Sequence, residues 1–212
     1  MSDSKLAVPE LAAIQIDGHT RQAFLVRGAF AAGAVYGLSA VTPFISEALA
    51  QDEEGDVGIL NFALTLEYLE AAYYKQALDQ VSDLNGDAKE LAALIQKDED
   101  EHVSGLTEAI KGLDGTPVKA PGVDFGDAFA SAEAFLKLAQ TLEDTGVSAY
   151  NGAGPSIQSK ELLATAGSIV QVEARHASAI RLQNGASPTD GAFDKPLDKN
   201  QVLEAVKPFV KA

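Results

Sequence analysis

Glutamate and histidine recur in this chain as two Glu-x-x-His motifs, Glu99 with His102 and Glu173 with His176. On an α-helix, residues three apart lie on one face with their Cβ atoms about 5–6 Å apart, so both side chains of a motif can reach one metal ion. Every histidine after residue 19 belongs to one of these motifs. The duplication predicts a site for two metal ions.

Four long helices are predicted around these motifs, because apolar residues recur at steps of three and four. The helices cover about residues 57–82, 87–112, 128–151 and 159–183. Each apolar stripe is interrupted by candidate metal ligands, which in chain order are Glu67, Glu99 with His102, Glu143, and Glu173 with His176. We therefore expect one carboxylate from each helix to point into a common core.

The helix ends carry their own signals. Asp87 is the expected cap of the second helix, and Asn184-Gly185 should end the fourth. A short terminal helix is expected near residues 199–210, with Asp198 as its cap. Residues 113–127 contain several Gly and Pro and form a connection. Extended, about 14 residues span roughly 45 Å and a 25-residue helix only about 37 Å, so the second and third helices can run parallel.

Composition excludes several classes of site and partner. The chain has 212 residues, no cysteine and a formal charge of -15. Without cysteine there are no disulfides, thiolate zinc sites or iron-sulfur clusters, so any metal must accept oxygen and nitrogen ligands. The negative charge argues against nucleic acid and anionic membrane surfaces, and it attracts small cations.

Residues 1–50 are predicted to be an export signal. A basic region at residues 20–27 precedes an uncharged run at 28–45 and an Ala-x-Ala site at 48–50. The basic region resembles a twin-arginine signal in which Gln22 replaces the second arginine. An uncleaved anchor is the alternative, since about 18–20 apolar residues span a bilayer. After cleavage, residues 51–185 would form the bundle and 186–212 an extension with a short helix, in a periplasmic, cell-surface or extracellular protein no longer bound to the membrane.

Taken singly, each candidate ligand could instead have an ordinary structural role. A Glu on a helix is usually solvated, and a His on an apolar helix face is usually a core residue with a hydrogen bond. Four buried carboxylates together, however, would repel one another and suffer desolvation costs unless cations neutralise them. Two divalent ions contribute +4 against their formal -4. A Glu, a Glu-x-x-His, a Glu and a Glu-x-x-His on four successive helices are the ligand pattern of di-iron and di-manganese carboxylate bundles.

At these motifs the chain resembles the ferritin-like superfamily, and most of all its exported members, which include desiccation-related proteins. The resemblance covers about residues 55–185 and is carried by LNFALTLEYLE at 60–70, DEDEH at 98–102 and VEARHA at 172–177. It implies an all-α four-helix bundle with a long crossover between helices two and three. It also implies that Glu99 and Glu173 bridge two ions, with Glu67 and His102 completing one and Glu143 and His176 the other.

Iron or manganese suits such ligands, and zinc can substitute. The reaction expected from the resemblance is ferroxidase, peroxidase or catalase chemistry with dioxygen or peroxide, in which no catalytic residue is separate from the metal ligands. The alternative is a non-catalytic, metal-stabilised binding or desiccation-protective protein. A homo-oligomer is possible, although nothing in the sequence indicates the surfaces of a mineral-storing shell.

Tyr74 and Tyr150 lie seven residues after Glu67 and Glu143 on the metal-facing side. They either hydrogen-bond to a ligand or pack in the core with a satisfied hydroxyl, and the second interpretation is preferred. Four further acids, Glu70, Asp98, Glu101 and Asp144, are expected in solvent, with Glu70 or Asp98 as candidates for a cation access path. His19 falls in the leader and has no predicted role.

Overall fold

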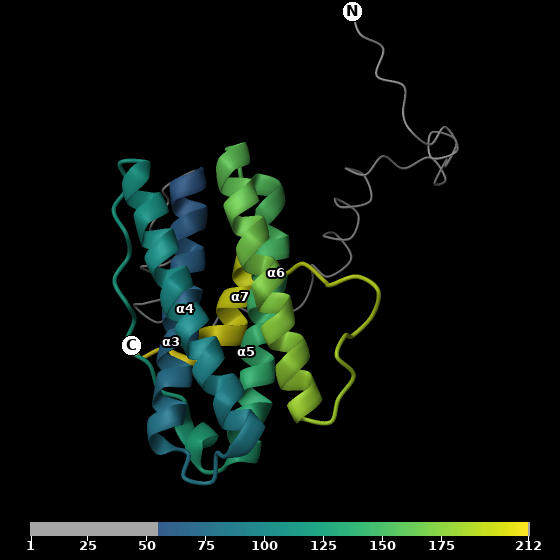
Figure 1. Ribbon diagram of the computed structural model, residues 1–212. Coiled ribbons are helices and arrows are strands. Elements are labelled where there is room, and N and C mark those ends of the chain that lie inside the picture. The colour runs from purple at the N-terminus through teal and green to yellow at the C-terminus, as the bar shows by residue number, and fades with distance from the viewer. Residues whose placement is uncertain (1–54, 212) are drawn as a thin grey trace, which may run out of the picture. The chain divides into compact units, whose positions relative to one another are not determined.

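Four long helices form a bundle in the computed structural model, which describes residues 55–211. They are α3 (Asp56–Gln80), α4 (Gly86–Gly112), α5 (Ala132–Ala153) and α6 (Lys160–Gln183). Helix α3 packs mainly against α4, and α5 against α6 (Figure 1). A short helix, α7 (Lys199–Val206), packs on α5. The predicted all-α fold class is confirmed.

The predicted crossover is confirmed as well. Residues 113–131 run alongside the bundle from the end of α4 to the start of α5, so these two helices point the same way (Figure 1). The buried side chain of Asn61 on α3 fastens this segment: its Nδ2 donates to the Thr116 carbonyl oxygen (3.1 Å), and its Oδ1 accepts from the Val118 N–H (2.9 Å). A 3-10 turn, η2 (Gly126–Phe129), completes the connection.

Several helix ends differ from the prediction. Asp87 is not the cap of α4; Asn85 holds that position and Asp87 lies in the first turn. Helix α5 begins later than expected because the Ser131 side chain accepts a hydrogen bond from the Ala134 N–H and caps it there. The terminal helix ends at Val206, where the Lys207–Phe209 turn (η4) with its proline begins.

Two predicted ends are confirmed. Asp198 caps α7 in a full capping box with Gln201. Helix α6 stops at Gln183, where Asn184 is the C-cap and Gly185 takes a positive φ of 69°. The leader and His19 lie outside the described residues, and none of the described helices has the length and apolarity needed to cross a membrane.

The core consists of two apolar layers at different heights in the bundle. One includes Tyr73, Ile95 and Phe135, and the other includes Leu64 and Leu106. Along each of the four helices, the predicted metal-facing glutamate lies between residues of these two layers. The apolar layers thus separate the glutamates from water at both ends of the bundle.

Gly152, near the end of α5, has no space for a side chain. A Cβ there would overlap the Leu197 carbonyl oxygen, and the Leu197 N–H donates to the Ser148 carbonyl oxygen at 3.0 Å. We expect Gly152→Ala to cost about 1–3 kcal/mol through overpacking. At roughly 2–4 °C per kcal/mol for a chain of this size, calorimetry should record a clear fall in Tm.

Gly167 provides the matched control, because it lies inside α6 and a Cβ there would meet nothing within 4 Å. Gly167→Ala should raise stability by about 0.5–1 kcal/mol through helix propensity. Equal changes in Tm for the two variants would contradict the packing of residue 197 against α5.

Candidate metal centre

The structure brings all six predicted ligands together in the middle of the bundle. They form two groups, each with donor atoms within 4.8 Å of one another: Glu67, Glu99, His102 and Glu173 in the first, and Glu99, Glu143, Glu173 and His176 in the second. All four glutamates are fully buried, and the His102 side chain is 11 % exposed. Glu99 and Glu173 belong to both groups.

The environment of His102 is the most informative part of the site. Its Nδ1 lies 2.9 Å from Glu173 Oε1 and 3.3 Å from both Glu67 Oε2 and Glu99 Oε2. A ring nitrogen carries one proton or one lone pair, so it cannot bond to three carboxylates at once. Ligand atoms about 2.1 Å from one ion and at right angles are about 3 Å apart. The spacing around His102 therefore fits the edges of a metal coordination shell.

The second group repeats this arrangement. His176 Nδ1 lies 3.1 Å from Glu99 Oε1 and 3.7 Å from Glu143 Oε2. The two oxygens of Glu99 thus face different histidines, Oε2 toward His102 and Oε1 toward His176. A carboxylate placed in this way can bridge two ions.

Several buried donor atoms of the site make no hydrogen bond to another described residue. They are Glu67 Oε2, Glu99 Oε1, Glu143 Oε2, both Glu173 oxygens and His176 Nδ1. Buried polar atoms are rarely left without partners, because the lost hydration costs free energy. All of these atoms belong to residues of the two donor groups, and their oxygen and nitrogen chemistry suits metal ions.

Tyr74 and Tyr150 each hydrogen-bond to a glutamate on the other of the two helices α3 and α5. These glutamates, Glu143 and Glu67, are called terminal here because each belongs to only one donor group. The Tyr74 hydroxyl on α3 donates to Glu143 Oε1 on α5 at 2.5 Å. The Tyr150 hydroxyl on α5 donates to Glu67 Oε1 on α3. Each tyrosine is thus satisfied by a candidate ligand on the other helix, and each glutamate keeps its second oxygen, Oε2, free to face the site.

The pKa values of the site residues are shifted because several acids are buried close together. Burial, together with repulsion from the neighbouring glutamates, raises the pKa of Glu99, Glu143 and Glu173. Burial would also raise the pKa of Glu67, but its close contacts with His102, Glu99 and the Tyr150 hydroxyl outweigh burial and lower that pKa. Burial would lower the pKa of His102, yet the surrounding carboxylates raise it to about 12. In the absence of metal ions, protons held by these glutamates and by His102 therefore balance the negative charge of the site.

Asp98 also belongs to the site, so the expectation that it lies in solvent is wrong. Its Oδ2 lies 3.3 Å from His176 Nε2, the ring nitrogen that points away from the glutamates. A carboxylate behind a ligand histidine fixes the ring and raises its basicity. The acid directly before Glu99 was the available signal, and the matching position before Glu173 is Val172, which has no carboxylate.

We expect Asp98→Asn to weaken metal binding at the His176 side by about 10- to 100-fold, the usual effect of losing such a partner. Titration of the metal-free chain with Mn²⁺ measures this change. Asp100→Asn is the control, since Asp100 is exposed on the same helix and bonds only to Gln96 in the described structure. Equal affinities for Asp98→Asn and the wild type would contradict the role of Asp98.

The prediction for Glu70 is wrong, because this side chain is buried, with 3 % exposure. Glu70 follows Glu67 by three residues and so lies only about 60° from it around α3. Burial and the charges of Glu173 and the other site glutamates raise the pKa of Glu70. The other two acids lie outside the core: Glu101 is exposed, and Asp144 pairs with Arg181 through two hydrogen bonds of 2.9 and 2.7 Å.

Comparison with known families agrees with this geometry. Residues 55–186, more than half of the chain, match the ferritin-like domain family. The chain belongs to the ferritin-like domain family. A search of curated proteins found no match. The family region of this ferritin-like protein coincides with α3 to α6 and contains every residue of the candidate metal centre.

Proposed function

We propose that this ferritin-like protein holds two metal ions, iron or manganese, and uses them for redox chemistry with dioxygen or peroxide. Glu99 and Glu173 would bridge the ions, Glu67 and His102 would complete one shell, and Glu143 and His176 the other. The observation that carries the proposal is the set of buried oxygen and nitrogen atoms that lack hydrogen bonds and converge from four helices. Zinc can occupy the same ligands without redox activity.

When bound to these ligands, two redox-active ions would supply the paired electrons that reduction of one oxidant molecule requires. The protein residues set the conditions for this chemistry. Tyr74 and Tyr150 orient the terminal glutamates through their hydrogen bonds. Asp98 holds His176 in place from behind. The apolar layers above and below exclude water, which strengthens every charge interaction in the site.

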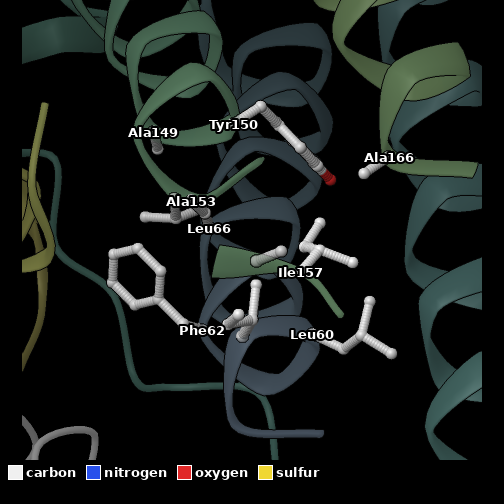
Figure 2. A pocket seen from close by; sticks show the side chains of 10 residues that line it. Leu60, Phe62, Leu66, Ala149, Tyr150, Ala153, Ile157 and Ala166 are labelled. Atoms are coloured by element: carbon white, nitrogen blue, oxygen red, sulfur yellow. The ribbon is translucent and has the colours of Figure 1, made fainter. Parts of the chain in front are cut away.

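An apolar pocket beside the site favours dioxygen as the oxidant. The pocket has a volume of about 20 Å³, room for one small molecule, and its lining includes Leu60, Ile157 and Ala166. Figure 2 shows Tyr150 on its wall, and Tyr150 supplies the sole hydroxyl of the lining. Because that hydroxyl bonds to Glu67, the pocket lies one side chain away from the proposed ion. A nonpolar gas suits this lining better than peroxide.

The experiment has two stages. Elemental analysis of protein from its own source should find iron or manganese at two ions per chain. The loaded protein should then oxidise ferrous iron with dioxygen or consume peroxide. Since the chain has no cysteine to relay electrons, peroxide reduction should require an added electron donor. Loaded protein inactive in both assays would refute the redox proposal.

A metal-stabilised protective protein without turnover is the second candidate. It is favoured by the position of the acids, which lie between two apolar layers where ions would neutralise them whether or not any reaction follows. A large fall in Tm on chelation combined with the absence of activity would support it. Export by way of residues 1–50 is likewise a proposal, and the N-terminal sequence of the protein recovered outside the cytoplasm tests it.

A further inference from the structure

Glu70 is the one acid of the site interior that the six-ligand assignment leaves without a role. Its residue surface is 3 % exposed, and its carboxylate lies close enough to the other site glutamates for their charges to act on it. A buried carboxylate beside other carboxylates is costly, so the position calls for a cation or a proton nearby.

Gly146 on α5 makes the space that Glu70 occupies. A Cβ at Gly146 would lie 3.1 Å from Glu70 Oε1 and 3.6 Å from Glu70 Oε2. The same Cβ would lie 3.5 Å from Glu173 Oε2, an oxygen without a hydrogen bond. The Glu70 carboxylate therefore points across the bundle toward the bridging glutamate, into a gap that exists only because residue 146 has no side chain.

Apart from Glu70, the site residues of α3 correspond to those of α5. Glu67 and Tyr74 on α3 correspond to Glu143 and Tyr150 on α5, with the same spacing of seven. By this correspondence, Glu70 on α3 is the counterpart of Gly146 on α5. A large acid on one side and an absent side chain on the other break the symmetry, so a fifth carboxylate is available to only one ion.

We propose that Glu70 is an additional metal ligand, serving the ion held by Glu143 and His176. This assignment rests on the proposed dinuclear centre and extends it. Glu70 lies outside the groups whose donor atoms fall within 4.8 Å of one another, so it reaches the ion by rotating its side chain. Glu70 faces Gly146, which is one turn from Glu143 on α5, and the charge of Glu143 acts more strongly on Glu70 than the charge of Glu67 does, which places Glu70 nearer to that ion than to the one beside His102.

Titration of the metal-free full chain with Mn²⁺, followed by calorimetry, tests the assignment. Glu70→Gln removes the charge at nearly constant shape, and Glu70→Asp keeps the charge but withdraws the carboxylate by one methylene. If Glu70 is a ligand, both variants should weaken one of the two Mn²⁺ equivalents by about tenfold or more and leave the other nearly unchanged. Glu101→Gln, an exposed acid on α4, is the control and should bind both ions like the wild type.

Gly146→Ala supplies an independent variant that leaves Glu70 in the sequence. Its methyl group would crowd Glu70 Oε1, so the same Mn²⁺ equivalent should weaken. If Glu70→Gln fails to give the helical circular dichroism of the wild type, this variant and Glu70→Asp carry the test.

The outcomes separate the two proposals. Wild-type protein that binds two Mn²⁺ ions while Glu70→Gln and Glu70→Asp bind them equally well refutes the ligand role of Glu70 alone. Weakening in Glu70→Gln with wild-type binding in Glu70→Asp also refutes it, because charge alone would then explain the effect. Wild-type protein that binds no Mn²⁺, Fe²⁺ or Zn²⁺ would overturn the dinuclear centre and this inference together.

Discussion

Replacing Glu99 and Glu173 together by alanine is expected to reduce metal binding from two ions per chain to none. Both carboxylates belong to both donor groups, and Glu99 turns one oxygen toward each histidine. Losing them removes two carboxylates from each shell and leaves, of the six ligands, one glutamate and one histidine per ion; Glu70 adds one carboxylate on the side of Glu143 only. Neither ion then keeps a full set of protein ligands or a carboxylate shared with the other ion. Elemental analysis after dialysis against Mn²⁺ or Fe²⁺ measures the occupancy.

The terminal glutamates provide a graded comparison. Glu67→Ala and Glu143→Ala should each lose one ion and keep the other, since each of these residues belongs to a single group. Glu101→Ala with Glu161→Ala is the matched control, because it removes two exposed acids from the same helices, α4 and α6. Loss of one ion only in the Glu99 and Glu173 double variant would show that these residues do not bridge.

Without metal, the protein is expected to become less stable as the pH rises from 5 to 8. Glu99, Glu143 and Glu173 have folded pKa values above the ordinary 4.5, so the folded state keeps protons that the unfolded chain has released. His102, with a folded pKa of about 12 against 6.5, acts in the same direction. Their stabilisation is complete below the unfolded pKa and is lost as the pH climbs toward the folded one.

Each proton retained only by the folded state costs about 1.4 kcal/mol of stability per pH unit. The lowered pKa of Glu67 has the opposite sign, but its contribution changes only when the pH falls below about 4.5. Bound ions replace these protons, so the metal-loaded protein should not lose stability in this range. The difference in Tm between loaded and chelated protein should therefore widen with pH.

Thermal melts at pH 5, 6, 7 and 8, with EDTA or with Mn²⁺, test this expectation. The variant with Glu99 and Glu173 both changed to glutamine is the control, since it removes two of the raised acids while keeping their shape. Its metal-free Tm should depend less steeply on pH. A chelated wild type whose Tm rises between pH 5 and 8 would contradict the burial of protonated acids in this site.

The fold and the six clustered residues could be predicted because helical periodicity alone fixes which side chains share a face. Glu67, Glu99, Glu143 and Glu173 are the acids on four apolar stripes, and the core they point into is common to all four. The crossover followed from the length of residues 113–127. Local signals failed at helix ends such as Asp87 and residue 128, where neighbouring Asn85 and Ser131 compete for the capping position.

Contacts between helices could not be read from one sequence. Glu70 is acceptable inside the bundle because Gly146 faces it from another helix, and no pattern within α3 indicates that vacancy. The crosswise partners of Tyr74 and Tyr150, and the contact of Asp98 with His176, likewise depend on the relative register of helices that are distant in sequence. Such register comes from packing, which acts only once the chain is folded.

The exchange of tyrosine hydroxyls between α3 and α5 has a consequence for assembly. The terminal glutamate of each helical hairpin, α3 with α4 or α5 with α6, is oriented by a tyrosine of the other hairpin. A hairpin formed alone would hold its glutamates and one histidine with no fixed geometry, and it would have little affinity for an ion. Docking of the hairpins completes both halves in a single event, so cation capture and final closure of the bundle should be cooperative.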